Sequence, residues 1–115
     1  MDIDNWLGKF KEYWVHHDVK RVLNLFHRDV EYYETPFQKL SNFSQLKGAW
    51  EGIGKQDNIK LDLKVYNKER NKYTVMWYLE YSYKNVVKKC AGTYLIELNN
   101  DNLCTYFFHC CENKL

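Results

Sequence analysis

The sequence predicts an α+β fold in which three N-terminal helices pack on one face of a mostly antiparallel sheet. Two observations carry this prediction. Apolar residues recur at three- and four-residue steps before Gln56, as on one face of a helix, and alternate with polar residues after it, as in half-buried strands. No Pro/Gly/Ser-rich stretch interrupts the 115 residues, so we expect one domain over residues 1–115.

The first two helices are indicated by apolar periodicity that follows possible capping residues. Asp2 or Asp4 can cap the first helix, whose apolar positions are Ile3, Trp6, Leu7, Phe10, Trp14 and Val15. Asp18 can cap the second helix, whose apolar face holds Val19, Val22, Leu23 and Phe26.

A short strand and a third helix follow. The run VEYYETPF at residues 30–37 is rich in β-branched and aromatic residues, and Pro36 closes it because proline lacks the N–H that a strand ladder needs. Ser41 or Ser44 is expected to open the third helix, which carries Leu46, Ala49, Trp50 and Ile53 on one side.

Four alternating segments then predict an antiparallel meander. Their apolar members are Ile59, Leu61, Leu63 and Val65; Val75, Trp77, Leu79 and Tyr81; Gly92, Tyr94, Ile96 and Leu98; and Leu103, Phe107, His109 and Cys111. A tight turn at residues 84–85 pairs Trp77 with Gly92. A turn at residues 100–101 pairs Leu98 with Leu103, and so sets Gly92 opposite His109 and Cys90 opposite Cys111.

Composition excludes several classes of function. A net charge of +2 is far from the basic excess of nucleic-acid-binding proteins, so we expect no nucleic-acid partner. No apolar run is long enough to span a membrane, and MDIDNWLGKF is not a secretory signal, so we expect a cytoplasmic protein. The four cysteines form no CxxC pair, and we expect reduced thiols.

Five sequence segments, which together span nearly the whole chain, occur in a characteristic order. They are WVHHD (14–18), VLNLFHRDVEYYETPF (22–37), AW (49–50), GTYLIEL (92–98) and CTYFFHC (104–110). In this order and spacing they resemble the SnoaL-like branch of the nuclear-transport-factor-2-like superfamily. The resemblance implies that the sheet is strongly curved and forms a cone with an internal pocket between sheet and helices.

The resemblance implies less about activity. Relatives include polyketide cyclases, ketosteroid isomerase and dehydratases, and members commonly dimerise through the outer sheet face. In ketosteroid isomerase an Asp directly before the strand-ending Pro is the base, and a Tyr on the first helix donates to the oxyanion. Here Thr35 precedes Pro36, and Phe10 stands at the helix position. Neither catalytic residue of the isomerase is therefore present at the matching position.

Glu34 and His109 are the candidate catalytic residues. Strand alternation places Glu34 on the inward face with Val30 and Tyr32, where burial would raise its pKa towards the range of a general base, unless the side chain reaches solvent at the strand end. His109 lies on the concave side next to Gly92, which leaves room for a ring or ligand, and is either a proton-transfer group or a satisfied core histidine. The two could form an acid/base pair across the cavity.

Aromatic residues are expected to line the cone, although each could equally serve core packing. The candidate lining residues are Trp14, Tyr32, Trp50, Trp77, Tyr94 and Cys111. They suit a small hydrophobic or aromatic molecule. Cys111 is either an inert buried thiol, a partner of Cys90 on oxidation, or a nucleophile beside His109. With no phosphate-binding loop, nucleophile elbow or metal-spaced His/Cys set, we expect neither cofactor nor metal.

Three functions remain compatible with these residues. The first is a small-molecule-binding domain that forms a homodimer through outward residues such as Met76, Tyr78 and Phe108. The second is a cofactor-independent isomerase, cyclase or hydrolase that uses Glu34 and His109. The third is a protein-interaction module that uses the outer aromatic face of the sheet. Whether the chain is an enzyme is left open by the sequence.

Overall fold

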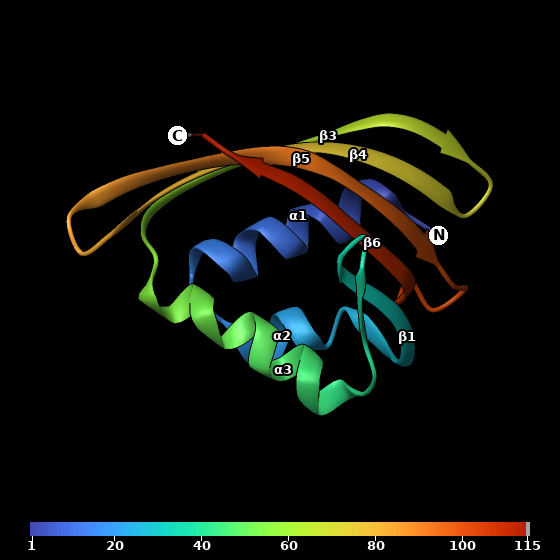
Figure 1. Ribbon diagram of the computed structural model, residues 1–115. Coiled ribbons are helices and arrows are strands. Elements are labelled where there is room, and N and C mark those ends of the chain that lie inside the picture. Colours follow the sequence, from blue (N-terminus) through green and yellow to red (C-terminus); the bar gives the residue numbers. More distant parts are fainter. Residues whose placement is uncertain (115) are drawn as a thin grey trace.

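The α+β class is confirmed by the structure, a computed structural model that describes residues 1–114. Three helices and a short 3₁₀ turn cover the concave face of one six-stranded sheet (Figure 1). The elements are α1 (Ile3–Val15), α2 (Val19–Leu23), β1 (Phe26–Thr35), β2 (Gln38–Leu40), α3 (Phe43–Glu51), η1 (Gly52–Lys55), β3 (Asp57–Glu69), β4 (Lys72–Tyr83), β5 (Val86–Leu98) and β6 (Cys104–Asn113). The strand order is β2-β1-β6-β5-β4-β3, and only the β1–β6 pair is parallel.

Capping side chains begin each helix. Asp2 caps α1 by accepting from the Asn5 backbone N–H at 3.0 Å, and Asp18 caps α2 by accepting from that of Arg21 at 3.1 Å. The prediction that Ser41 or Ser44 opens α3 is wrong, because Asn42 caps it instead. An Asn side chain serves as well as Ser at this position, so the residue types alone could not separate them.

The predicted extension of the second helix to Phe26 is also wrong. α2 ends at Leu23, and Phe26 begins β1 opposite Cys104 in the parallel ladder. The backbone N–H of Cys104 donates to the carbonyl of Leu25 at 2.9 Å. This partner lies far along the chain, so the periodicity of the segment gave no sign of it.

The predicted register is confirmed between β4 and β5 and wrong between β5 and β6. Trp77 pairs with Gly92 as expected. Gly92, however, lies opposite Cys111 rather than His109, a shift of two residues, and Cys90 lies opposite Asn113 rather than Cys111. The cause is a longer loop, in which the Asn99 side chain accepts two backbone N–H groups, and an irregularity in the ladder beside Leu98. Because the shift is even, the inward residues keep their face.

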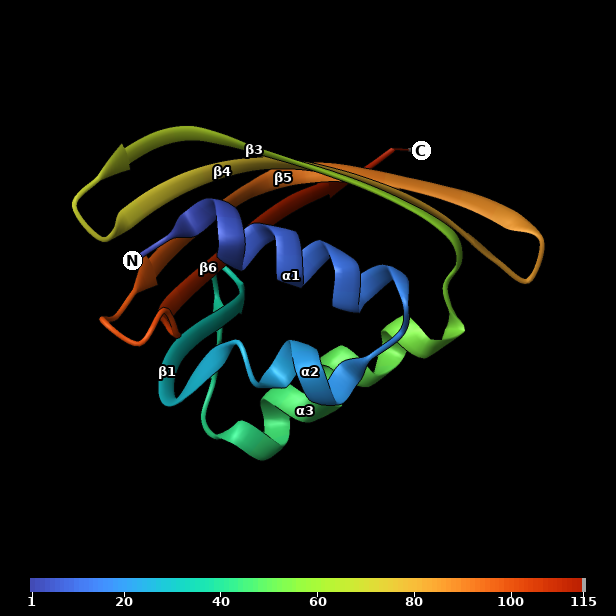
Figure 2. The ribbon, with the colours of Figure 1, turned by 180° about the vertical axis from the view of Figure 1, so that it is seen from behind.

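The sheet arches over α1, while α2 and α3 lie further from its centre and close the lower side (Figures 1 and 2). The core between these layers is dominated by aromatic rings. Trp6, Phe10 and Phe107 are its largest fully buried side chains. The core borders a hollow that is lined by residues of α3 and η1 as well as of the sheet, and the candidate site lies there.

Candidate functional site

A cavity of about 390 Å³ lies between the concave face of the sheet and the segment α3–η1. We call it the aromatic cavity. The residues that the sequence places at the site all line it, namely Trp14, Tyr32, Glu34, Trp50, Trp77, Tyr94, His109 and Cys111. Its size lies within the usual range for small-molecule pockets. The structure thus brings these side chains together; what they do is a separate question.

The aromatic walls are fixed by ring packing across different elements. Trp77 on β4 stacks on Tyr94 on β5 with ring centroids 5.2 Å apart and planes 13° apart. Trp14 on α1 meets Trp50 on α3 edge to face at 5.0 Å. Phe10 packs behind both walls, with its ring 5.3 Å from Trp50 and 5.9 Å from Tyr94. The walls are therefore preformed by the core and do not need a ligand to hold them.

Two of the four tryptophans carry buried N–H groups that lack a partner. The Trp6 indole donates to the Leu25 carbonyl at 3.0 Å, and the Trp14 indole donates to the Gln56 side-chain oxygen at 2.8 Å. Nε1 of Trp77 is buried and makes no hydrogen bond within residues 1–114. Nε1 of Trp50 is buried too and lies close to the Tyr32 hydroxyl, but not in hydrogen-bond geometry. An unpaired buried donor costs about 1–3 kcal/mol, so these two groups favour an acceptor that enters the cavity.

Glu34 and His109 lie side by side on the parallel strands β1 and β6, so they are neighbours on one wall of the cavity. Nδ1 of His109 is 2.8 Å from the backbone carbonyl of Glu34. Because a carbonyl only accepts, Nδ1 carries the proton and Nε2 of a neutral ring is left as an acceptor. Burial raises the pKa of the Glu34 carboxyl, and the nearby His109 partly offsets this.

The tyrosine hydroxyls of the cavity are held in their neutral form. Burial is the main reason that the pKa of Tyr32 and the pKa of Tyr94 both lie well above the usual value, and the charge of Glu34 adds to both effects. Both phenols therefore stay protonated at physiological pH. Each can donate a hydrogen bond to a ligand that lies against it.

Gly92 does not leave room for a ligand, contrary to the expectation from the sequence. A Cβ atom added at Gly92 would meet the Cys110 backbone oxygen at 1.8 Å. The residue is glycine because β5 and β6 approach too closely there for any side chain. His109 nevertheless lines the aromatic cavity, together with Ala49 and Trp50 of α3.

The thiols at the cavity are poor nucleophiles. Partial burial raises the pKa of Cys90, and partial desolvation together with the charge of Glu34 raises the pKa of Cys111, so both stay protonated at neutral pH. Cys111 itself is exposed, so the alternative of a buried thiol at this position is wrong. All four cysteines are unpaired. Within residues 1–114, no group of three His, Cys, Asp or Glu side chains is placed to hold a metal ion.

Sequence reasoning missed Gln56 and Phe107 as cavity residues. Gln56 lies between η1 and β3 and orients Trp14 through its side-chain oxygen. The one sequence signal for Gln56 as a cavity residue is its position directly before the alternating segment that forms β3. Phe107 was placed on the inward face of its strand but was not named as a lining residue; its ring lines the cavity and stacks on Tyr32 at 4.9 Å.

Solved structures share this architecture at low sequence identity. An NTF2-like protein of unknown function from Exiguobacterium sp. 255-15 is 14% identical, with 95% of this chain and 99% of that chain covered and a TM-score of 0.76. The chain has the nuclear-transport-factor-2-like fold. Δ5-3-ketosteroid isomerase from Mycobacterium sp. (13% identity, 96% and 90% covered, TM-score 0.74) and AusH from Aspergillus nidulans (14%, 95% and 84%, TM-score 0.77) share it.

The similarity lies in structure and not in sequence. No protein-family model and no curated protein sequence matches the chain. Identities this low establish a common fold and leave the chemistry to the residues of the site. Within residues 1–114, no helix has the length and apolar character that a membrane crossing requires.

Proposed function

We propose that the aromatic cavity binds a small, flat, largely apolar molecule that carries an oxygen acceptor. The observation that carries this proposal is the pair of unpaired indole N–H groups of Trp50 and Trp77, both in side chains at least nine-tenths buried. An apolar body stacks against the rings, and the acceptor takes up the donors that the protein leaves without partners. A carbonyl or phenol oxygen on a cyclic body has this chemistry.

The test compares two molecules that differ only in the acceptor, 1-tetralone and tetralin, by isothermal titration calorimetry. We expect 1-tetralone to bind about 5-fold more tightly, which corresponds to about 1 kcal/mol for one hydrogen bond to a buried donor. Trp77→Phe keeps an aromatic ring and removes the N–H. It should reduce the preference for 1-tetralone, whereas Trp6→Phe, at an indole already paired with Leu25, should keep it.

Both variants also lose some ring area, but that loss affects the two molecules alike and cancels in their ratio. Failure of both molecules to bind at millimolar concentration would overturn the proposal. Equal affinity of the wild-type protein for the two would show that the indole donors do not select the ligand.

Catalysis is the second candidate, and the pairing of Glu34 with His109 favours it. A carboxyl with a raised pKa and an imidazole with a free Nε2 can move a proton between two positions of a bound molecule without a cofactor. An isomerase, cyclase or hydrolase of this kind would convert its ligand. Proton NMR of each ligand after incubation separates the candidates, because it detects an isomerised product of unchanged mass as well as a hydrolysed one, and we expect the ligand to be recovered unchanged.

A second copy of this chain is the partner that we propose for the outer face of the sheet. Outward residues there form an uncharged block across neighbouring strands, in which Met76 pairs with Thr93, Thr93 with Cys110, and Leu95 with Phe108. Met76, Tyr78 and Leu95 are exposed at 49%, 37% and 40%. A patch of this kind is typical of an interface, and a two-fold axis buries it against itself.

We expect a dimer of about twice 14.0 kDa in light scattering at micromolar concentration. Met76→Lys places a charge in the block and should shift the population to monomers. Lys64→Glu, at the neighbouring position on β3, changes an existing charge and should have a much smaller effect. A wild-type mass of one chain at every concentration would contradict the proposal.

A further inference from the structure

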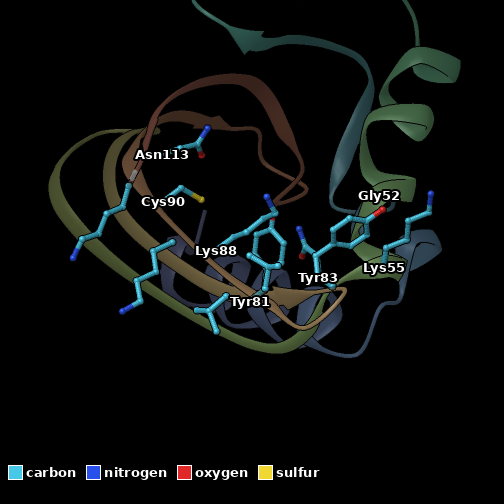
Figure 3. Close-up of a pocket in the computed structure, with 12 residues that line it drawn as sticks. Gly52, Lys55, Tyr81, Tyr83, Lys88, Cys90 and Asn113 are labelled. Carbon is cyan, nitrogen blue, oxygen red and sulfur yellow. The ribbon is translucent and has the colours of Figure 1, made fainter.

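The aromatic cavity opens into a second hollow of about 590 Å³, which we call the lysine mouth. The two hollows share Gly52, Gln56, Tyr81 and Cys90. Figure 3 looks at the lysine mouth: Tyr81, Lys88, Cys90 and Asn113 come from the strands on one side, and Gly52 and Lys55 from the end of α3 and η1 on the other. A molecule that occupies the aromatic cavity extends towards this opening.

The charged side chains that line the lysine mouth are all lysines. Its lining includes Lys55, Lys88, Lys89 and Lys114 and no carboxylate side chain. Lys89 is compensated by Glu80, whose carboxylate is 3.6 Å from its ammonium group. Lys55, Lys88 and Lys114 make no salt bridge with any side chain of residues 1–114. Three ammonium groups without an ion-pair partner among these side chains therefore border the way into the cavity.

Lys88 is placed differently from a lysine that only keeps a hairpin solvated. It pairs with Tyr81 on β4 and shares the concave face of β5 with Cys90 and Tyr94, both of which line the aromatic cavity. Lysines that protect sheets from aggregation usually lie at edges or on exposed faces. Lys55 ends η1 on the opposite wall. The two lysines therefore border the same opening from different elements.

We infer that the lysine mouth binds a carboxylate or a similar anionic group on the ligand, so that the natural ligand is a cyclic organic acid. The inference rests on the proposed binding function and names its ligand class. The cyclic body lies among the rings, and the anion stays at the opening, where Lys55 and Lys88 neutralise it without full burial. An anion at the partly hydrated opening avoids the large desolvation cost that it would meet inside the cavity.

The test uses three probes that share one ring system: 2-naphthaleneacetate, 2-naphthaleneacetamide and 2-(2-naphthyl)ethylamine. We expect the acid to bind about 5- to 10-fold more tightly than the neutral amide at low salt, and the amine to bind most weakly. The advantage of the acid should shrink between about 0.02 and 0.5 M NaCl, because salt screens charges at an open site. The affinity of the amide should hardly change.

Lys88→Gln should remove most of the preference for the acid, and Lys55→Gln with Lys88→Gln should abolish it while amide binding persists. Lys84→Gln is the matched control, because it removes the same charge from the same hairpin at a residue outside the lysine mouth. It should retain the preference. If Lys84→Gln lost as much of the preference for the acid as Lys88→Gln does, the overall charge of the protein, and not the lysine mouth, would attract the acid.

The outcomes separate this inference from the proposed function. If acid and amide bind equally well, the lysine mouth does not recognise anions, although the aromatic cavity still binds the ring. If none of the three probes binds, the proposed function fails and this inference fails with it. If the acid binds best, with salt sensitivity that disappears in Lys88→Gln, the inference stands.

Discussion

Replacing Gly92 with alanine should lower the free energy of unfolding by about 3 kcal/mol, at the upper end of the usual cost of overpacking. The added Cβ would meet the Cys110 carbonyl oxygen at 1.8 Å and two further backbone atoms at 2.8 Å. Backbone cannot turn aside as a flexible side chain can, so β5 and β6 would have to separate. The expected readout is a lower urea midpoint by circular dichroism.

Gly8→Ala is the matched control for this prediction. Gly8 is exposed within α1, and an added Cβ there meets nothing within 4 Å. Alanine in a helix interior is favoured over glycine by about 0.5–1 kcal/mol, so this variant should gain stability. A Gly92→Ala protein as stable as the wild type would mean that the strands do not approach as the structure shows.

Replacing Phe10 with alanine should cost about 3–5 kcal/mol, the usual range for removing a buried aromatic ring. The Phe10 side chain is 0% exposed. Its ring packs against those of Trp6, Trp14, Trp50, Tyr94 and Phe107 at centroid separations of 5.0, 5.5, 5.3, 5.9 and 6.2 Å. Loss of this ring removes support from both walls of the aromatic cavity, so ligand binding should weaken as well.

Phe37→Ala provides the comparison at the same residue type. Phe37 follows Pro36 in the β1–β2 turn and is 100% exposed. Its removal should change the free energy of unfolding by less than about 0.5 kcal/mol. Urea unfolding of both variants measures the difference, and similar losses would contradict the placement of Phe10 at the centre of the core.

The sequence predicted the parts of this molecule that depend on local pattern. Alternation marked the inward faces of β3 to β6, and the positive φ of Lys84 and Asn85 agrees with the tight turn that set the β4–β5 register. A register shift of two residues leaves each side chain on the same face of the sheet, because side chains alternate with a period of two. His109 and Cys111 therefore still line the cavity although the predicted pairing of β5 with β6 was shifted.

The features that escaped prediction depend on partners far along the chain. The parallel pairing of β1 with β6 decided where α2 ends and placed Glu34 beside His109. The close approach at Gly92 is a property of two strands and cannot be read from either one. The lysine mouth joins residues from η1 and β5, which lie far apart along the chain. In the sequence its lysines therefore look like ordinary solvated surface charges in two unrelated segments.

The most direct test of the account is an NMR titration of the four tryptophan indole N–H groups with 1-tetralone, after assignment by single Trp→Phe variants. We expect the indole protons of Trp50 and Trp77 to move downfield as they gain a hydrogen bond, while that of Trp6 stays in place because it already donates to Leu25. Tetralin should produce no downfield shift at either position. Indole signals of Trp50 and Trp77 that stay unchanged at saturating 1-tetralone would contradict the proposal that these donors receive the ligand.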